Sequence, residues 1–182
     1  MSTFLYQEII DFWFTELEPE KWWQKDSALD LMIQTRFGEL HTQATAGELF
    51  NWRDTALGSL AEIILLDQFS RNIYRDTPQS FAYDAMALAL SQSAIAKKFD
   101  NDLTPVQRVF LYIPFMHSES KLIHTHAVTL FRSVGIQSNL DFEFQHKAII
   151  DKFGRYPHRN HILGRQSTAE EIAFLQQPNS GF

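Results

Sequence analysis

The chain has 182 residues, of which 45% are hydrophobic, 14% aromatic and 21% charged, a balance that fits one soluble domain with a substantial core. A net charge of −6 gives no electrostatic basis for binding nucleic acid or a membrane, and the lack of cysteine excludes disulfides and thiolate chemistry. No stretch approaches the length of a membrane span and the N-terminus does not resemble a signal peptide, so we expect a cytoplasmic protein with a single helical domain over residues 1–182.

Three helices are predicted in the first half of the chain, where apolar residues recur every three or four positions. Thr3 can cap the first, which Pro19 ends, and Asp26 can cap the second, which Gly47 ends. The third opens near Asp54 and carries apolar residues over a wide arc. A helix of that kind is expected at the buried centre of the fold.

Two further helix starts place a threonine before a proline, whose missing N–H is tolerated at the first helical position. They lie at Thr77-Pro78 and at Thr104-Pro105. The core face predicted for the first of these helices consists of Phe81, Ala85, Leu88 and Ala89. In the second helix Pro114 denies a backbone hydrogen bond, so we expect a kink or break just before His117.

The remaining pattern predicts three more helices. Glycines at 135 and 154 end the first two, and Thr168 with Glu171 forms a capping box that begins the last. Residues 154–166 have no helical stripe and are long enough to be a functional loop. Because no alternating strand pattern occurs, we predict an all-α fold of about eight antiparallel helices.

Charge is distributed unevenly along the chain. Through residue 103 there are 8 basic and 16 acidic residues, whereas residues 104–182 hold 8 basic and 6 acidic ones. The segment 154–168 contains three arginines and two histidines without an acid, and Arg71, Asn72 and Arg75 form a second small group. If the fold unites the two groups, they would form an anion site. The alternative is that each arginine caps a helix or pairs with a carboxylate such as Asp67.

Other local features indicate weaker candidates. His117-Ser118-Glu119 places a histidine beside a carboxylate, the minimum for acid–base chemistry, although Ser118 can equally begin a helix. The start of the last helix, after Gly164, is a second candidate anion site unless Glu171 occupies it. His146 lies on an apolar stripe and is expected to be a core residue. No metal-binding, nucleotide-binding or hydrolase signature is present, so we expect neither metal nor cofactor.

Five strings of the sequence resemble an uncharacterised bacterial family, domain of unknown function family nine-two-four. They are Asp-Phe-Trp-Phe from Asp11, Leu-Leu-Asp-Gln-Phe-Ser-Arg-Asn-Ile-Tyr-Arg from Leu65, His-Ser-Glu from His117, Phe-Gly-Arg-Tyr-Pro-His-Arg-Asn from Phe153 and Leu-Gly-Arg-Gln-Ser-Thr from Leu163. The likeness runs from about Phe4 to Phe174. It implies an all-α array similar to tetratricopeptide helical hairpins, and no established activity.

Three hypotheses of function follow. The first is a module that binds a small anionic ligand, a carboxylate or phosphate, or a peptide. The second is a protein–protein adaptor. The third is a hydrolase in which His117 or His158 is the general base, Glu119 orients it and the arginine-rich loop stabilises developing negative charge. No catalytic residue is assigned. The candidate binding residues are Arg71, Asn72, Arg75, His117, Glu119, Arg155, His158, Arg159, Asn160 and Arg165.

Overall fold

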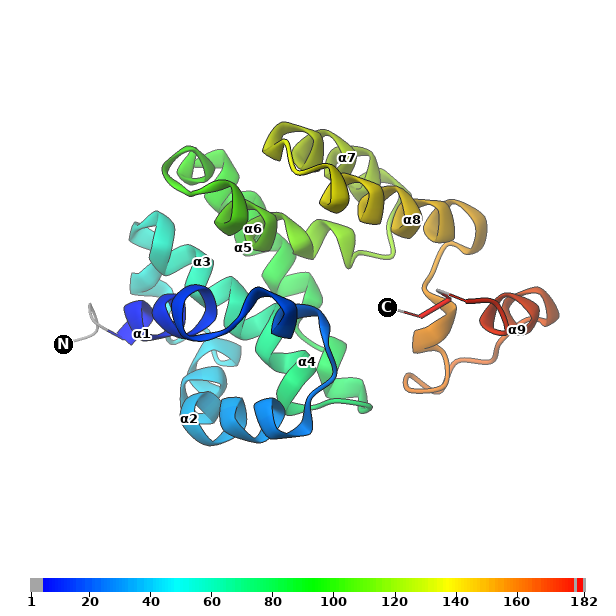
Figure 1. Cartoon of the computed structure of the whole chain (residues 1–182), viewed down its shortest axis with the longest axis horizontal. Coiled ribbons are helices and arrows are strands. Elements are labelled where there is room, and N and C mark those ends of the chain that lie inside the picture. Colours follow the sequence, from blue (N-terminus) through cyan, green and yellow to red (C-terminus); the bar gives the residue numbers. More distant parts are fainter. Residues whose placement is uncertain (1–4, 179, 182) are drawn as a thin grey trace.

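The computed structural model of the chain describes residues 5–178 and 180–181 (Figure 1). These residues form helices joined by short 3₁₀ and π-helical turns and include no strand, which confirms the all-α prediction. The α-helices are α1 Leu5–Asp11, α2 Ser27–Thr45, α3 Ala56–Ile64, α4 Ser70–Ile73, α5 Asp84–Ala96, α6 Pro105–Met116, α7 Lys121–Val134, α8 Gln137–Phe153 and α9 Ala169–Leu175. The predicted cap Thr3 lies outside the described residues.

Most helix ends are set by the side chains that the sequence analysis identified. The carboxylate of Asp26 accepts the backbone N–H groups of the first turn of α2. Thr104 and Thr168 form capping boxes at the starts of α6 and α9. Gly135 and Gly154 adopt the left-handed conformation, with φ of 81° and 70°, and end α7 and α8. These predictions are confirmed, because each of these helix ends depends on hydrogen bonds or backbone conformation within a few residues.

The segment after Pro78 differs from the prediction. The hydroxyl of Thr77 donates to the carbonyl of Tyr74 instead of capping a helix, and Pro78–Phe81 forms a 3₁₀ turn. Helix α5 therefore begins only at Asp84, and the predicted core face is rotated. The face that is buried consists of Ala87, Ser91 and Ala94, and not of Phe81, Ala85, Leu88 and Ala89. Small residues on this face let α5 pack closely between α3 and α6.

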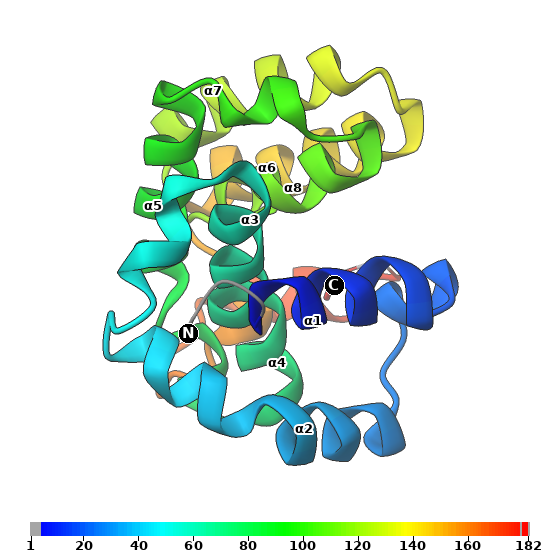
Figure 2. The ribbon, with the colours of Figure 1, turned by 90° about the vertical axis from the view of Figure 1, so that its left-hand side faces the viewer.

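The centre of the fold is one long helical stretch made of α3, a π-helical turn at Leu65–Phe69 and α4. Every residue from 58 to 70 is buried, which confirms the prediction of a buried central helix. Figure 2 shows α3 inside the fold, with α2 at one end and α7 at the other. The π-helical turn matters for the site because it contains Asp67.

Helix α6 ends where the sequence predicts a break. It runs two residues past Pro114, and His117 is its C-cap. Ser118 does not begin the next helix, because Ser120 is the residue that caps α7. Helix α7 packs between α6 and α8. The chain then forms the loop predicted over residues 154–166, which includes a 3₁₀ turn at Pro157–Arg159 and leads to α9 at the edge of the fold (Figure 1).

The apolar core is divided unequally. One large cluster joins residues from α1 to α7, whereas only three buried apolar residues, Ile149, Ile150 and Tyr156, form a second cluster beneath the C-terminal segment. None of the helices in the described part of the chain is both long and apolar enough to cross a bilayer.

Candidate functional site

A cleft of about 350 Å³ opens where the start of α5, the end of α6 and the loop before α9 meet. The apolar residues of its lining, the apolar wall, include Phe81, Ala85 and Leu88. The polar residues, the polar wall, are Asp84, His117, Ser118, Glu119 and Arg159, and the two sets adjoin because Asp84 lies in the same helix as Ala85 and Leu88. A mostly apolar lining with a few polar groups is typical of a small-molecule site.

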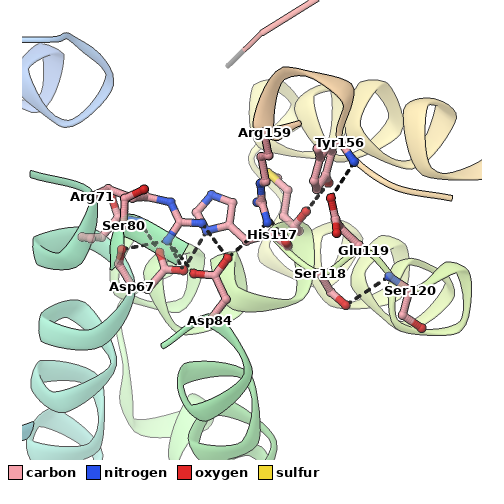
Figure 3. Close-up of polar contacts among 12 residues, drawn as sticks. Asp67, Arg71, Ser80, Asp84, His117, Ser118, Glu119, Ser120, Tyr156 and Arg159 are labelled. Carbon is pink, nitrogen blue, oxygen red and sulfur yellow. Dashed lines mark hydrogen bonds and ion pairs between the residues drawn. The ribbon is translucent and has the colours of Figure 1, made fainter. Parts of the chain in front are cut away.

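Asp67 and His117 form a hydrogen-bonded pair at the inner end of this polar wall (Figure 3). The Oδ1 atom of Asp67 lies 2.7 Å from Nδ1 of His117, and Gln68 donates to the other carboxylate oxygen. Burial would raise the pKa of Asp67, but the charge of Arg71 and the hydrogen bonds from His117 and Gln68 outweigh it and hold that pKa far below its usual range. The carboxylate is therefore ionised. It lies in a π-helical turn, a local irregularity that is frequent at functional sites.

Arg71 and Arg159 share the carboxylate of Asp84. Arg71 binds it with two hydrogen bonds of 2.8 and 3.0 Å, and also reaches Asp67. Arg159 approaches Asp84 less closely, with an Nη1–Oδ2 distance of 3.3 Å. Its Nη2 atom donates to the backbone carbonyl of His117 at 3.0 Å. One arginine from each of the two groups that the sequence separates, Arg71 and Arg159, thus contacts the same carboxylate (Figure 3).

The guanidinium of Arg159 is held between two aromatic rings. Its central carbon lies 4.6 Å from the ring centroids of both Phe81 and Tyr156. The residue is 6% exposed, and its Nε atom has no hydrogen-bond partner among the residues that the structure describes. Burial and the charge of Arg71 lower the pKa of Arg159 from its ordinary value. The position of this cation is thus fixed, while its hydrogen-bonding capacity is only partly used.

Glu119 does not orient His117, so that part of the hydrolase hypothesis is wrong. Its carboxylate accepts two hydrogen bonds from Arg165, of 2.7 and 2.8 Å, and one from the backbone N–H of Tyr156. Glu119 thereby attaches the C-terminal loop to the end of α6. The residue that orients His117 is Asp67.

Other candidates lie away from the cleft or are bound within the loop. Asn72 and Arg75 both bind Asp30 of α2. Arg155 and Asn160 bind Glu171, with Arg155 forming two bonds of 2.6 and 2.8 Å. The same Glu171 accepts the N–H of Thr168, so the start of α9 is occupied by this side chain and not open to an anion.

Two histidines of the C-terminal region are withdrawn from solvent: His146 is buried and His158 half-buried. Burial lowers the pKa of His158 to about 4 and that of His146 to about 3, so both rings are neutral near pH 7. Nδ1 of His146 donates to the carbonyl of Phe142 at 2.8 Å, as expected for a core residue. Over residues 5–178 and 180–181, no group of three or more potential ligands could hold a metal ion.

Two residues of the site are not among the candidates that the sequence predicts. The sequence indicates Asp67 only as a partner for an arginine, although its position four residues before Arg71 on the same helix is a usable signal. Asp84 has no such signal. Asp84 begins α5, a helix whose apolar residues show little periodicity, and its partner Arg159 is 75 residues away in the sequence. No local signal could therefore have identified Asp84.

Comparison with known proteins assigns the chain to a family. The sequence model of a family described as bacterial protein of unknown function, DUF924, matches residues 9–179. The chain belongs to this family. A solved structure of a protein of unknown function from Agrobacterium tumefaciens is 37% identical, with a TM-score of 0.92, and the match covers 97% of this chain and 99% of that one. No curated protein matches the chain. The family and its structural relative thus support the fold and carry no assigned activity.

Proposed function

We propose that the cleft binds a small molecule with an anionic group, a carboxylate or a phosphate. The observation that supports this proposal is that Arg159 is buried but incompletely hydrogen-bonded. This cation is buried and fixed between two rings, it lines the cleft, and it makes only two hydrogen bonds to described residues, one of them long. Buried cations are usually fully paired, so an anion in the cleft would complete the partners of this one.

The dimensions of the cleft suit a metabolite. A volume of about 350 Å³ corresponds to about a dozen water-sized groups. Its apolar wall would cover the carbon skeleton of the ligand while the polar wall binds the charged group. Neither the family nor its structural relative specifies a ligand. The proposal therefore rests on the geometry of the cleft.

The test is ligand-induced stabilisation, with phosphate and malate as probes and chloride at equal ionic strength as reference. A probe at about 100 times its dissociation constant should stabilise the wild type by about 2.7 kcal/mol. Arg159→Gln should remove the effect. The control is Arg75→Gln, which also loses an arginine–aspartate pair but lies away from the cleft. Equal stabilisation of both variants would contradict the proposal.

A second candidate function, hydrolysis, is favoured by the Asp67–His117 pair in the cleft. Nε2 of His117 would take a proton from water as the water oxygen attacks an ester carbon, and the departing alkoxide would then receive that proton. Nitrophenyl esters provide the assay. Hydrolysis should exceed the buffer rate in the wild type and in His161→Asn, an exposed-histidine control, and should be lost in His117→Asn. The same rate in all three proteins would contradict it.

An adaptor role and a cytoplasmic location remain predictions. The adaptor hypothesis is supported by exposed apolar side chains, among them Leu122, Phe142 and Phe144 on α7 and α8. Pull-down with those side chains replaced would test it. Cell fractionation would test the location.

A further inference from the structure

The pair formed by His117 and Asp67 fixes which nitrogen of the imidazole carries hydrogen. The buried carboxylate of Asp67 is ionised and can only accept, so the 2.7 Å contact requires a hydrogen on Nδ1 of His117. Burial and the neighbouring charge of Arg71 lower the pKa of His117, although Asp67 opposes them. Near neutral pH the ring is therefore uncharged, and its Nε2 atom has a free lone pair.

Nε2 of His117 is an unused acceptor on a residue that lines the cleft. His117 lines the cleft, and across the described ranges of the chain this atom has no hydrogen-bond partner. The carboxylates of Asp84 and Glu119 also line it, but both are bound by arginines. The polar wall thus offers a ligand an incompletely paired cation, on Arg159, a neutral acceptor, on His117, and the hydroxyl of Ser118.

The cation and the neutral acceptor belong to residues that are in direct contact. Nη2 of Arg159 lies 3.0 Å from the backbone carbonyl of His117, so the cation sits directly beside the residue that carries the acceptor. A ligand that contained only acceptors would satisfy the cation and leave the lone pair of Nε2 facing another lone pair. A neutral acceptor requires only an uncharged donor. A hydroxyl is the smallest group of a ligand that supplies one.

We infer that the cleft takes a small hydroxylated carboxylic acid, with its carboxylate at Arg159 and its hydroxyl donating to Nε2 of His117. This inference rests on the proposed function and deepens it, because it names the chemical class of the ligand. His117 acts as a specificity-determining residue, and Asp67 is a positioning residue that keeps the hydrogen on Nδ1.

The experiment compares two pairs of acids that differ only by a hydroxyl, malate with succinate and lactate with propionate, by titration calorimetry. The hydroxy acid of each pair should bind at least tenfold more tightly to the wild type, because a buried acceptor left without a donor weakens binding strongly. The informative variant is His117→Asn. Its amide nitrogen can replace Nδ1 as donor to Asp67, but it has no counterpart of Nε2, so the preference should disappear while both acids still bind.

The control variant is His161→Asn, which changes an exposed histidine and should keep the preference. A second measurement does not depend on any variant folding. The ¹⁵N spectrum of wild-type His117 should show hydrogen on Nδ1 and a free Nε2, and the Nε2 resonance should shift when malate is added.

The outcomes distinguish this inference from the function on which it rests. Equal affinity for the two acids of each pair, with binding lost in Arg159→Gln, would overturn the hydroxyl requirement and leave anion binding intact. Hydrogen on Nε2 in the ¹⁵N spectrum would overturn it as well. No binding of any of the four acids would overturn both proposals.

Discussion

Stability should fall in mild acid because of a buried histidine in α2. His41 is 1% exposed, and its Nε2 atom lies 2.8 Å from the hydroxyl oxygen of Ser70. That hydroxyl donates to the carbonyl of Leu66, so it accepts a hydrogen from Nε2 of His41. Among the residues that the structure describes, the ring has no second hydrogen-bond partner, so a second proton would have no acceptor there. Burial accordingly lowers the pKa of His41 from 6.5 to about 4.

The sign and size of the effect follow from these two values. The unfolded chain binds a proton at His41 as the pH falls below 6.5, whereas the folded chain does not until about 4. The contribution of neutral His41 to the free energy of unfolding is therefore fully present above pH 6.5 and is lost as the pH falls toward 4. Between about pH 7 and pH 5 the free energy of unfolding should fall by about 2 kcal/mol from this residue alone.

The variant His41→Gln tests this quantity. Its amide can still donate to Ser70 but does not titrate, so the loss of stability from pH 7 to pH 5 should be smaller by about 2 kcal/mol than in the wild type. Urea unfolding at both pH values measures the difference, and any constant effect of the substitution cancels.

The control is His161→Gln, because that histidine is exposed and its surroundings change little on unfolding. It should show the wild-type pH dependence. If His41→Gln shows the same pH dependence as the wild type, then the folded protein accepts a proton at His41 and the reasoning from burial is refuted.

Two matched comparisons test packing and buried charge by urea unfolding. A methyl group on Gly58 would lie 2.2 Å from a backbone oxygen, so Gly58→Ala should destabilise the fold by about 3 kcal/mol, whereas Gly38→Ala, with nothing within 4 Å, should stabilise it by about 0.5 kcal/mol or more. Effects of the same sign would contradict the close contact. Arg53→Met should cost about 3–5 kcal/mol because it leaves the fully buried Glu62 unpaired, whereas Arg36→Met, which breaks an exposed pair, should cost less than about 1 kcal/mol. Equal losses would show that Glu62 finds another partner.

Helix boundaries could be predicted where a residue acts on its own backbone. Asp26, Thr104 and Thr168 cap helices through atoms two or three residues away, so the sequence contains the whole interaction. Thr77 has the same pattern but its hydroxyl turns back to Tyr74. The outcome there depends on the preceding turn, which the local pattern does not contain.

The site could be predicted only in part. The sequence identified His117 and Arg159 by their residue types and by the break at the end of α6. It could not assign their partners, because Asp67 and Asp84 lie 50 and 75 residues away along the chain. The acid-free stretch at 154–168 was misleading for the same reason. Its arginines are paired with carboxylates that other parts of the fold supply, including Glu119.

The small size of the second apolar cluster determines which part of the protein unfolds most easily. The C-terminal segment buries few apolar side chains and is attached mainly by ion pairs such as Arg165–Glu119. Amide hydrogens of α9 should therefore exchange with solvent through a partial opening that leaves the amides of α3 protected. Arg159 belongs to the segment that opens, whereas His117 does not. A ligand that bridges the two would join both parts of the molecule into one cooperative unit.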